Sequence, residues 1–213
     1  KLKVIVSGRN KKSVSKVRKL LSNFNNLIES NKPEIVISLG GDGTYFFNER
    51  KFPGIPKLLI RDNSVCKLCS IYDLKNINSY LKKLNQKEFE IIKNTKIVCK
   101  FKNKKLEAIN DIVIRNKNQC EAIRFELKIN KENLNDIIGD GIVVSTAFGS
   151  TAYYNSITKS KFTKGLGLAL NNVNKPETKL DIREDDIIKF KLLRGVATIS
   201  ADNNKKLLTL KEK

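Results

Sequence analysis

The chain contains no histidine, no tryptophan and no methionine among its 213 residues. Without histidine, neither a Ser-His-Asp triad nor a Cys-His pair can form. General acid–base chemistry near neutral pH must then depend on Asp, Glu, Lys or Tyr side chains. The composition therefore excludes the nucleophilic mechanisms that rely on an imidazole.

Long apolar runs are also missing. No run approaches the roughly 18 residues that would span a membrane, and the mean hydropathy is −0.35. The short apolar run Leu2–Val6 is followed at once by polar residues, unlike a signal peptide. We therefore expect a cytoplasmic protein with no membrane partner.

Cysteine is scarce, with four residues in the whole chain. Cys66 and Cys69 have the spacing of half a zinc site or of a redox pair, but no second pair and no histidine completes such a site. The other two, Cys99 and Cys120, are isolated in the sequence. We expect reduced thiols and no structural disulfide.

Acidic residues are few relative to basic ones. The chain has 42 Lys and Arg and 22 Asp and Glu, which gives a formal net charge of +20. Such a field concentrates anions. The sequence has no zinc-finger spacing, no aromatic-rich RNA-binding strand and no basic helix interleaved with aromatic residues. Because the basic residues are also spread along the chain, we expect a small phosphorylated ligand and no nucleic-acid partner.

The first part of the chain alternates strand and helix. Leu2–Ser7 is a predicted strand, and Lys12–Ile28 carries apolar residues at helical spacing. Glu34–Leu39 is the next predicted strand, followed by Lys57–Ile60, and Asp73–Leu84 is a predicted helix. Strand, helix and strand in this order indicate a Rossmann-like parallel sheet covered by helices.

After residue 86 the pattern becomes rich in short strands separated by turns. The predicted strands are Phe89–Ile92, Lys96–Phe101, Leu106–Arg115, Ile123–Ile129, Gly141–Thr146, Ile187–Leu193, Val196–Ser200 and Leu207–Leu210. Arg194 and Gly195 are predicted to form a tight hairpin turn. The fold class is therefore an α/β domain over residues 1–86, followed by an all-β domain.

The first motif that carries chemistry is Gly40-Gly41-Asp42-Gly43-Thr44, between a strand and a predicted helix that begins near Thr44. Its glycines allow positive φ and bring bare N–H groups against phosphate, and a helix N-terminus adds a favourable dipole. Asp42 could bind Mg²⁺ or accept a proton from an attacking hydroxyl. The alternative is a plain strand-to-helix turn with a capping side chain.

The second motif is Gly139-Asp140-Gly141, which leads into a strand and a loop of small and hydroxyl residues. The hydroxyl groups belong to Ser145, Thr146, Ser150, Thr151 and Tyr153. Hydroxyls and accessible backbone amides suit a nucleoside and its phosphates. A Ser/Thr-rich turn is the structural alternative.

The third motif is Asn110-Asp111 at the start of an apolar strand. An Asn amide can pair with an adenine edge in both directions, and a carboxylate can accept from two ribose hydroxyls. Alone, such a pair is more often a turn or a β-bulge.

Together these three motifs resemble those of the NAD kinase family, in the same order. The Gly-Asp-Gly segment with its Ser-Thr-rich continuation is specific. Gly-Gly-Asp-Gly is shared with diacylglycerol and sphingosine kinases and with phosphofructokinases. The resemblance implies NAD kinase activity on an α/β domain followed by a β-sandwich-like domain.

The resemblance also implies a role for each motif. Asp42 would deprotonate the adenosine 2′-hydroxyl of NAD, with Gly43 beside it. Asn110 and Asp111 would hold the adenosine, although the family more often has Glu at the second position, and Asp140 would contact another part of the dinucleotide. The nucleoside pocket would be lined by Thr151, Ala152, Tyr153 and Ser156.

The expected partners follow from the same resemblance. The phosphoryl donor would be ATP or inorganic polyphosphate, with Mg²⁺ or another divalent cation, and the protein would form homodimers or homotetramers. Residues 87–200 would form the NAD-binding domain, and residues 201–213 would return as a strand to the first domain.

Two segments depart from the family pattern. Arg61–Leu68 has no glycine where a glycine-containing run is expected, and Ile157–Lys161 replaces an expected glycine pair. Both lie near the donor in the family, so the donor and the level of activity stay open. The alternatives are a lipid kinase of the same superfamily, disfavoured by Thr151-Ala152-Tyr153, and a non-catalytic relative that binds dinucleotides or polyanions.

Overall fold

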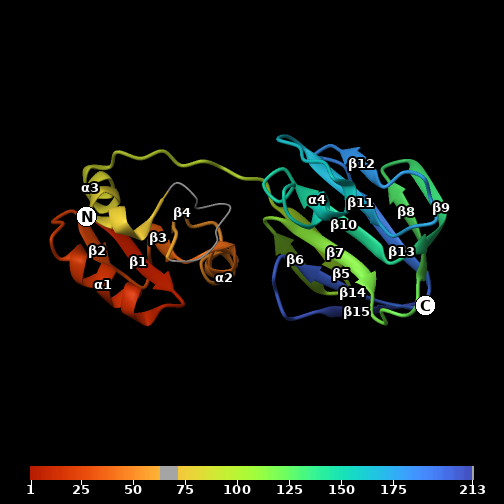
Figure 1. Cartoon of the computed structure of the whole chain (residues 1–213), viewed down its shortest axis with the longest axis horizontal. Helices are drawn as coiled ribbons and strands as arrows, with labels where there is room; N and C mark the ends of the chain where they lie inside the picture. The colour runs from red at the N-terminus through yellow and green to blue at the C-terminus, as the bar shows by residue number, and fades with distance from the viewer. Residues whose placement is uncertain (63–71, 213) are drawn as a thin grey trace. The chain divides into compact units, whose positions relative to one another are not determined.

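The computed structural model describes residues 1–62 and 72–212. The chain forms two compact units, Lys1–Ile92 and Lys93–Lys213 (Figure 1). The predicted boundary lay between residues 86 and 87. Cys66, Cys69 and residues 63–68 of the departing segment lie outside the described residues. A parallel sheet with helices followed by antiparallel sheets confirms the predicted fold class.

The first unit is built on a four-stranded parallel sheet with the order β2-β1-β3-β4. Its strands are β1 (Leu2–Gly8), β2 (Leu27–Glu29), β3 (Ile35–Leu39) and β4 (Lys57–Ile60). Its helices are α1 (Lys11–Leu21), α2 (Asp42–Lys51), the 3-10 turn η1 (Leu74–Asn76) and α3 (Ile77–Gln86).

The helices α1 and α3 pack against the same apolar core of the first unit. Val17 of α1 and Leu81 of α3 are fully buried in one cluster with Val4 of β1 and Ile37 of β3. On β3, Ser38 points to the opposite face, because side chains alternate along a strand. There it contacts α2 through Asn48, so the helices cover both faces of the sheet.

The predicted helix Lys12–Ile28 is wrong at its C-terminal end. The helix ends at Leu21, and Leu27–Glu29 pairs in parallel with β1 as an edge strand. The apolar spacing continued past the helix because Leu27 is also a core residue, contributed by the strand.

The second unit contains a six-stranded sheet with the order β12-β11-β10-β7-β14-β15, a three-stranded sheet β13-β8-β9 and the hairpin β5-β6. The first strands are β5 (Ile97–Phe101), β6 (Lys104–Ala108), β7 (Asp111–Asn116), β8 (Ile123–Ile129), β9 (Glu132–Gly139) and β10 (Gly141–Thr146). The rest are β11 (Leu166–Asn171), β12 (Lys179–Ile182), β13 (Ile188–Arg194), β14 (Val196–Ala201) and β15 (Leu208–Lys211), with one helix, α4 (Tyr153–Thr158).

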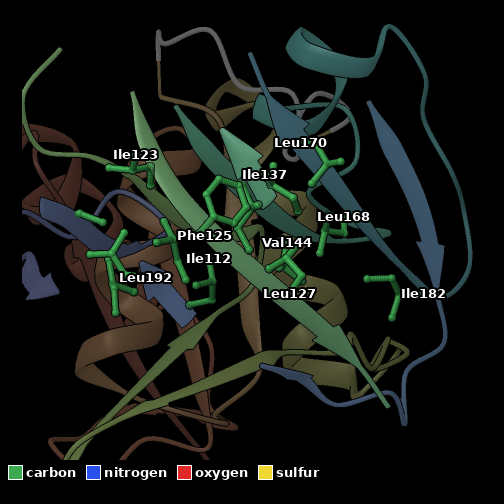
Figure 2. Close-up of a cluster of buried hydrophobic side chains, with 14 of the residues drawn as sticks. Ile112, Ile123, Phe125, Leu127, Ile137, Val144, Leu168, Leu170, Ile182 and Leu192 are labelled. Carbon is green, nitrogen blue, oxygen red and sulfur yellow. The ribbon is translucent and has the colours of Figure 1, made fainter. Parts of the chain in front are cut away.

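The two larger sheets share one hydrophobic core. Figure 2 shows Ile112 and Val144 of the six-stranded sheet with Phe125 and Leu127 of the three-stranded sheet. On the other face of the six-stranded sheet, α4 packs Tyr154 into a smaller cluster with Val143. The strands β7 and β10 are therefore covered on both faces, which explains why they read as continuous apolar runs.

Several predictions for the second unit are wrong. Phe89–Ile92 is not a strand, and Ile92 is 78% exposed. Arg194 and Gly195 do not form a hairpin turn, because β13 pairs with β8 and β14 with β7 and β15. The chain passes from one sheet to the other at Gly195, whose φ of +94° favours glycine.

The last strand also differs from its prediction. Residues 208–211 pair antiparallel with β14, inside the second unit, and so do not return to the first. No helix in the described part of the chain has the length and apolar character needed to cross a membrane.

Candidate functional site

The Gly-Gly-Asp-Gly loop lies at the point of the parallel sheet where ligands commonly bind. In the sheet order β2-β1-β3-β4, β2 lies on one side of β1, and β3 and β4 lie on the other. The strand order therefore reverses between β1 and β3, which makes this the topological switch point of the sheet. Open α/β sheets bind ligands outside the carboxyl ends of the strands at this point. Gly40 directly follows β3 there, as the sequence predicted.

Gly40 and Gly41 of this loop occupy positions with different structural requirements. Gly40 has a φ of +149°, and a Cβ built on it would lie 2.4 Å from Thr44 Oγ1. Gly41 is the N-cap of α2, and Asp42 is in its first turn, two residues earlier than the predicted helix start. A helix N-terminus favours negative charge, so this loop can accept phosphate groups.

A buried polar network fixes α2 on the sheet. Asn48 is fully buried, donates through Nδ2 to Ser38 Oγ at 2.8 Å and accepts from Ser7 Oγ at 2.6 Å. The three residues come from α2, β3 and β1, so the network ties the helix that carries Asp42 to the ends of both central strands. Asn48 could not be singled out from the sequence, because a single Asn within a helix carries no distinguishing signal.

In the second unit, Asn110 and Asp111 come together with Ser145 and Thr146, the hydroxyl residues at the end of β10. Thr146 N donates to the Asn110 carbonyl at 2.9 Å, and Ser145 Oγ donates to the same oxygen at 3.2 Å. Asp111 is paired with Ser145 in the β7–β10 register. Gly149 packs directly against Asn110. The second and third motifs of the sequence therefore meet at one end of β7.

A third segment closes this group. The carboxylate of Asp202, one residue beyond β14, accepts from the amides of Ile109, Asn110 and Asp111, at 2.8 Å from Asn110 N. We call Asn110, Asp111, Ser145, Thr146 and Asp202 the Asn110 cluster. Asp202 was not among the predicted site residues, since residues 201–213 were expected only to form a strand.

Two groups in the Asn110 cluster have properties that are typical of ligand-binding residues. The Asn110 Oδ1 atom is buried, and no described residue donates a hydrogen bond to it. Asp111 is 7% exposed, and burial, with a smaller contribution from the charge of Asp202, raises the pKa of Asp111 to about 7. Perturbed carboxylates and unpaired buried acceptors are concentrated at functional sites.

Asp140 lies at the other end of the β7–β10 pair. Its carboxylate accepts from Asn116 Nδ2 at 3.3 Å and from Asn172 Nδ2 at 3.2 Å. A Cβ on Gly139 would lie 2.5 Å from the Asn172 carbonyl, and one on Gly141 would lie 2.0 Å from that of Ile114. Close backbone packing therefore accounts for both glycines of the motif.

The segment from Thr151 to Ser156 connects the two ends of the sheet. Ala152 N donates to the Gly149 carbonyl at 2.9 Å, next to Asn110, whereas Tyr153 Oη accepts from Asn171 Nδ2 at 3.2 Å. Asn171 in turn accepts from the Asp140 amide through its carbonyl. Thr151 and Ser156 are exposed, and Ser156 Oγ donates to the Tyr153 carbonyl within α4.

The side chains present do not form a closed metal site. Among residues 1–62 and 72–212, no group of three or more His, Cys, Asp or Glu side chains is arranged to hold a metal ion. Mg²⁺ in phosphoryl-transfer sites commonly binds through one or two carboxylates together with substrate phosphates and water. Asp42, in the Gly-Gly-Asp-Gly loop, is a carboxylate that could take this role.

Comparison with known proteins gives a consistent result. Residues 109–160 match the ATP-NAD kinase C-terminal domain. The chain is 32% identical over 129 residues to the NAD kinase of Sulfurimonas denitrificans, covering 58% of this chain and 45% of that one. It is 31% identical over 131 residues to the NAD kinase of Clostridium kluyveri, of which it covers 46%. The chain thus spans less than half the length of these curated relatives.

Solved structures agree on the fold. The crystal structure of an Archaeoglobus fulgidus NAD kinase in complex with ATP superimposes with a TM-score of 0.82 at 18% identity, covering 99% of this chain and 88% of that one. That of yeast NADH kinase complexed with NADH gives 0.81 at 16% identity, covering 99% and 76%. The fold of both units and the resemblance inferred from the motifs are confirmed.

Proposed function

Because this chain is a relative of the NAD kinases, we propose that it transfers a phosphoryl group from ATP or polyphosphate to the adenosine 2′-hydroxyl of NAD, forming NADP. In this proposal Asp42 is the base, and Asn110 and Asp111 contact the dinucleotide. The single observation that carries the proposal is the buried Oδ1 of Asn110, to which no described residue donates a hydrogen bond, in the residue that precedes the buried Asp111.

This pair suits the adenosine half of NAD. A buried acceptor without a partner costs about 1–3 kcal/mol, which a donor on the ligand would recover. An adenine amino group or a ribose hydroxyl provides such a donor, and the Asp111 carboxyl can accept from further hydroxyls. Tyr153, the first residue of α4, packs against the cluster that contains Tyr154 and Val143, and it adds an aromatic surface for the nucleoside.

In the proposed reaction Asp42 is the general base. Its carboxylate takes the proton from the 2′-hydroxyl, the 2′-oxygen attacks the terminal phosphorus of the donor in line, and the bond to the leaving phosphate breaks. The N-terminus of α2 and the glycine amides favour the negative charge of the donor. The network of Ser7, Ser38 and Asn48 holds α2 in place for this role.

A divalent cation such as Mg²⁺ would bind with the donor phosphates, and Asp42 is the residue that would contact it. When bound, the cation neutralises charge on the transferring phosphoryl group. The ATP complex of the Archaeoglobus protein supports ATP as the first donor to test. The net charge of +20 suits polyphosphate equally well. We also retain the proposals of a homodimer or homotetramer and of a cytoplasmic location.

The test is NADP formation from NAD and Mg²⁺, measured in parallel reactions with ATP and with polyphosphate. We expect product with at least one donor, and the productive reaction identifies that donor. If neither donor gives product while calorimetry detects NAD binding, the kinase proposal is wrong and the chain is a dinucleotide-binding relative.

A further inference from the structure

Asp202 is held in an unusual position by the backbone of the Asn110 cluster. Its carboxylate accepts from three consecutive amides: Ile109 N at 3.1 Å, Asn110 N at 2.8 Å and Asp111 N at 3.3 Å. Successive backbone amides that converge on one anion form a compact anion-binding concavity. In this chain a side chain of the protein itself occupies that concavity.

The backbone of Asp202 is aligned with the same segment. Its amide donates to the Asp111 carbonyl at 2.9 Å, which extends the pairing of β14 with β7 by one residue. Its φ of +46° lies in the left-handed region, which Asp adopts more readily than most residues. Asp202 is therefore attached to residues 109–111 through both its main chain and its side chain.

The opposite side of Asn110 is fixed as well. Its carbonyl accepts from Thr146 N and Ser145 Oγ, and Gly149 packs against its α-carbon. Asn110 is thus held from β10 on its carbonyl side and from Asp202 on its amide side. Hydrogen bonds on both sides of its backbone suit Asn110 if its side chain must keep a buried oxygen available for a ligand.

We propose that Asp202 is a positioning residue that fixes Asn110 and Asp111 in the geometry required to bind the dinucleotide. The inference rests on the function proposed above for the same site. Asp202 acts through the 109–111 backbone, since its oxygens are directed to those amides. Its loss should therefore weaken the binding of NAD and leave the binding of the phosphoryl donor unchanged.

The test compares Asp202→Asn and Asp202→Ser with a matched control, Asp186→Asn. Asp186 also accepts a backbone amide, that of Arg183 at 2.9 Å, and belongs to the same unit, but it lies in a separate turn. Thermal unfolding and circular dichroism identify the variants that fold. Because Asn and Ser each retain an acceptor oxygen, at least one of the two substitutions should leave the fold intact.

Two readouts are required. In steady-state kinetics, we expect the KM for NAD to rise by about tenfold or more in the Asp202 variants, while the KM for the donor stays within about twofold. A tenfold rise corresponds to a loss of about 1.4 kcal/mol in the free energy of NAD binding. In amide hydrogen exchange, Ile109, Asn110 and Asp111 should exchange faster than in the unsubstituted protein. The control should show neither change.

The outcomes separate this inference from the function on which it rests. A folded Asp202 variant with unchanged KM for NAD and unchanged exchange at residues 109–111 would overturn the positioning role. A rise in both KM values together would overturn it too, because it would indicate a general structural loss. Absence of NADP formation by the unsubstituted protein would instead refute the proposed function, and the exchange measurement would still test the backbone contact.

Discussion

The backbone of Gly149 lies so close to Asn110 that a Cβ added to it would be 2.3 Å from the Asn110 carbonyl oxygen and 2.5 Å from its α-carbon. Both neighbouring atoms belong to the main chain, so they cannot move aside as a flexible side chain would. The loop after β10 can therefore reach Asn110 only if residue 149 is glycine.

Gly149→Ala should accordingly damage stability and ligand binding together. We expect a loss of about 1–3 kcal/mol in the free energy of unfolding, as for other overpacked sites, because the loop and Asn110 must separate. The KM for NAD should rise as Asn110 is displaced. Urea unfolding and an NAD titration check this, and a variant as stable and as tightly binding as the unsubstituted protein would show that the contact is not required.

Asn48→Ala should destabilise the first unit. The substitution removes both hydrogen bonds of a fully buried side chain and leaves the hydroxyls of Ser7 and Ser38 without this partner. We expect a loss of about 2–4 kcal/mol, combining unsatisfied polar groups with a small cavity. Asn78→Ala, an exposed position on α3, is the control and should change stability by about 0.5 kcal/mol or less. Equal unfolding curves for the two variants would refute the role of the network.

Asp111 should make stability fall as the pH rises. The folded protein holds the Asp111 proton up to about pH 7, where its pKa lies, whereas an unfolded chain releases it near pH 4. Between these values the folded state binds more protons, so the free energy of unfolding decreases with pH. Asp111→Asn, which cannot ionise, should gain stability relative to the unsubstituted protein from pH 5 to 7 and show no further gain above. Parallel pH profiles would contradict the raised pKa.

Substitutions of Tyr153 should separate its ring from its hydroxyl. Tyr153→Phe loses the hydrogen bond from Asn171 Nδ2 but keeps the packing of the ring against the cluster that contains Tyr154 and Val143. We expect its Kd for NAD to stay within about threefold, whereas Tyr153→Ala should weaken binding by about tenfold or more, because stacking on a base contributes about 1–3 kcal/mol. Equal affinities for the Phe and Ala variants would exclude the ring from the nucleoside pocket.

The parts of the fold that could be predicted from the sequence are those with local signals. The strand Lys57–Ile60 and the strand Gly141–Thr146 have the predicted bounds, because turn residues delimit each apolar run. The strands β11 and β12 are among those that were missed, because Leu166–Asn171 contains a glycine in a loop-like context and Lys179–Ile182 is short and half polar. The prediction of a hairpin at Gly195 was wrong because the partners of β13 and β14 are strands distant in the sequence.

The candidate site divides in the same way. Asp42, Asn110 and Asp111 could be named as candidates from the sequence because their motifs are contiguous. The separation of Asp140 from Asn110 could not be predicted, since it depends on the register of β7 with β10. Asp202 contacts Asn110 across 92 residues of sequence, so no local sequence pattern could predict this contact.

The most direct test of the central claim is the rate of NADP formation by Asp42→Asn, with the Kd for NAD measured by calorimetry. Glu29→Gln is the control, because it also neutralises a carboxylate of the first unit, one that forms a surface ion pair with Arg18 at 2.7 Å. We predict that Asp42→Asn lowers kcat by about 10²–10⁴-fold, as for loss of a general base, while NAD affinity and the control stay nearly unchanged. A kcat close to that of the unsubstituted protein, or an equal loss of binding and turnover, would contradict the account.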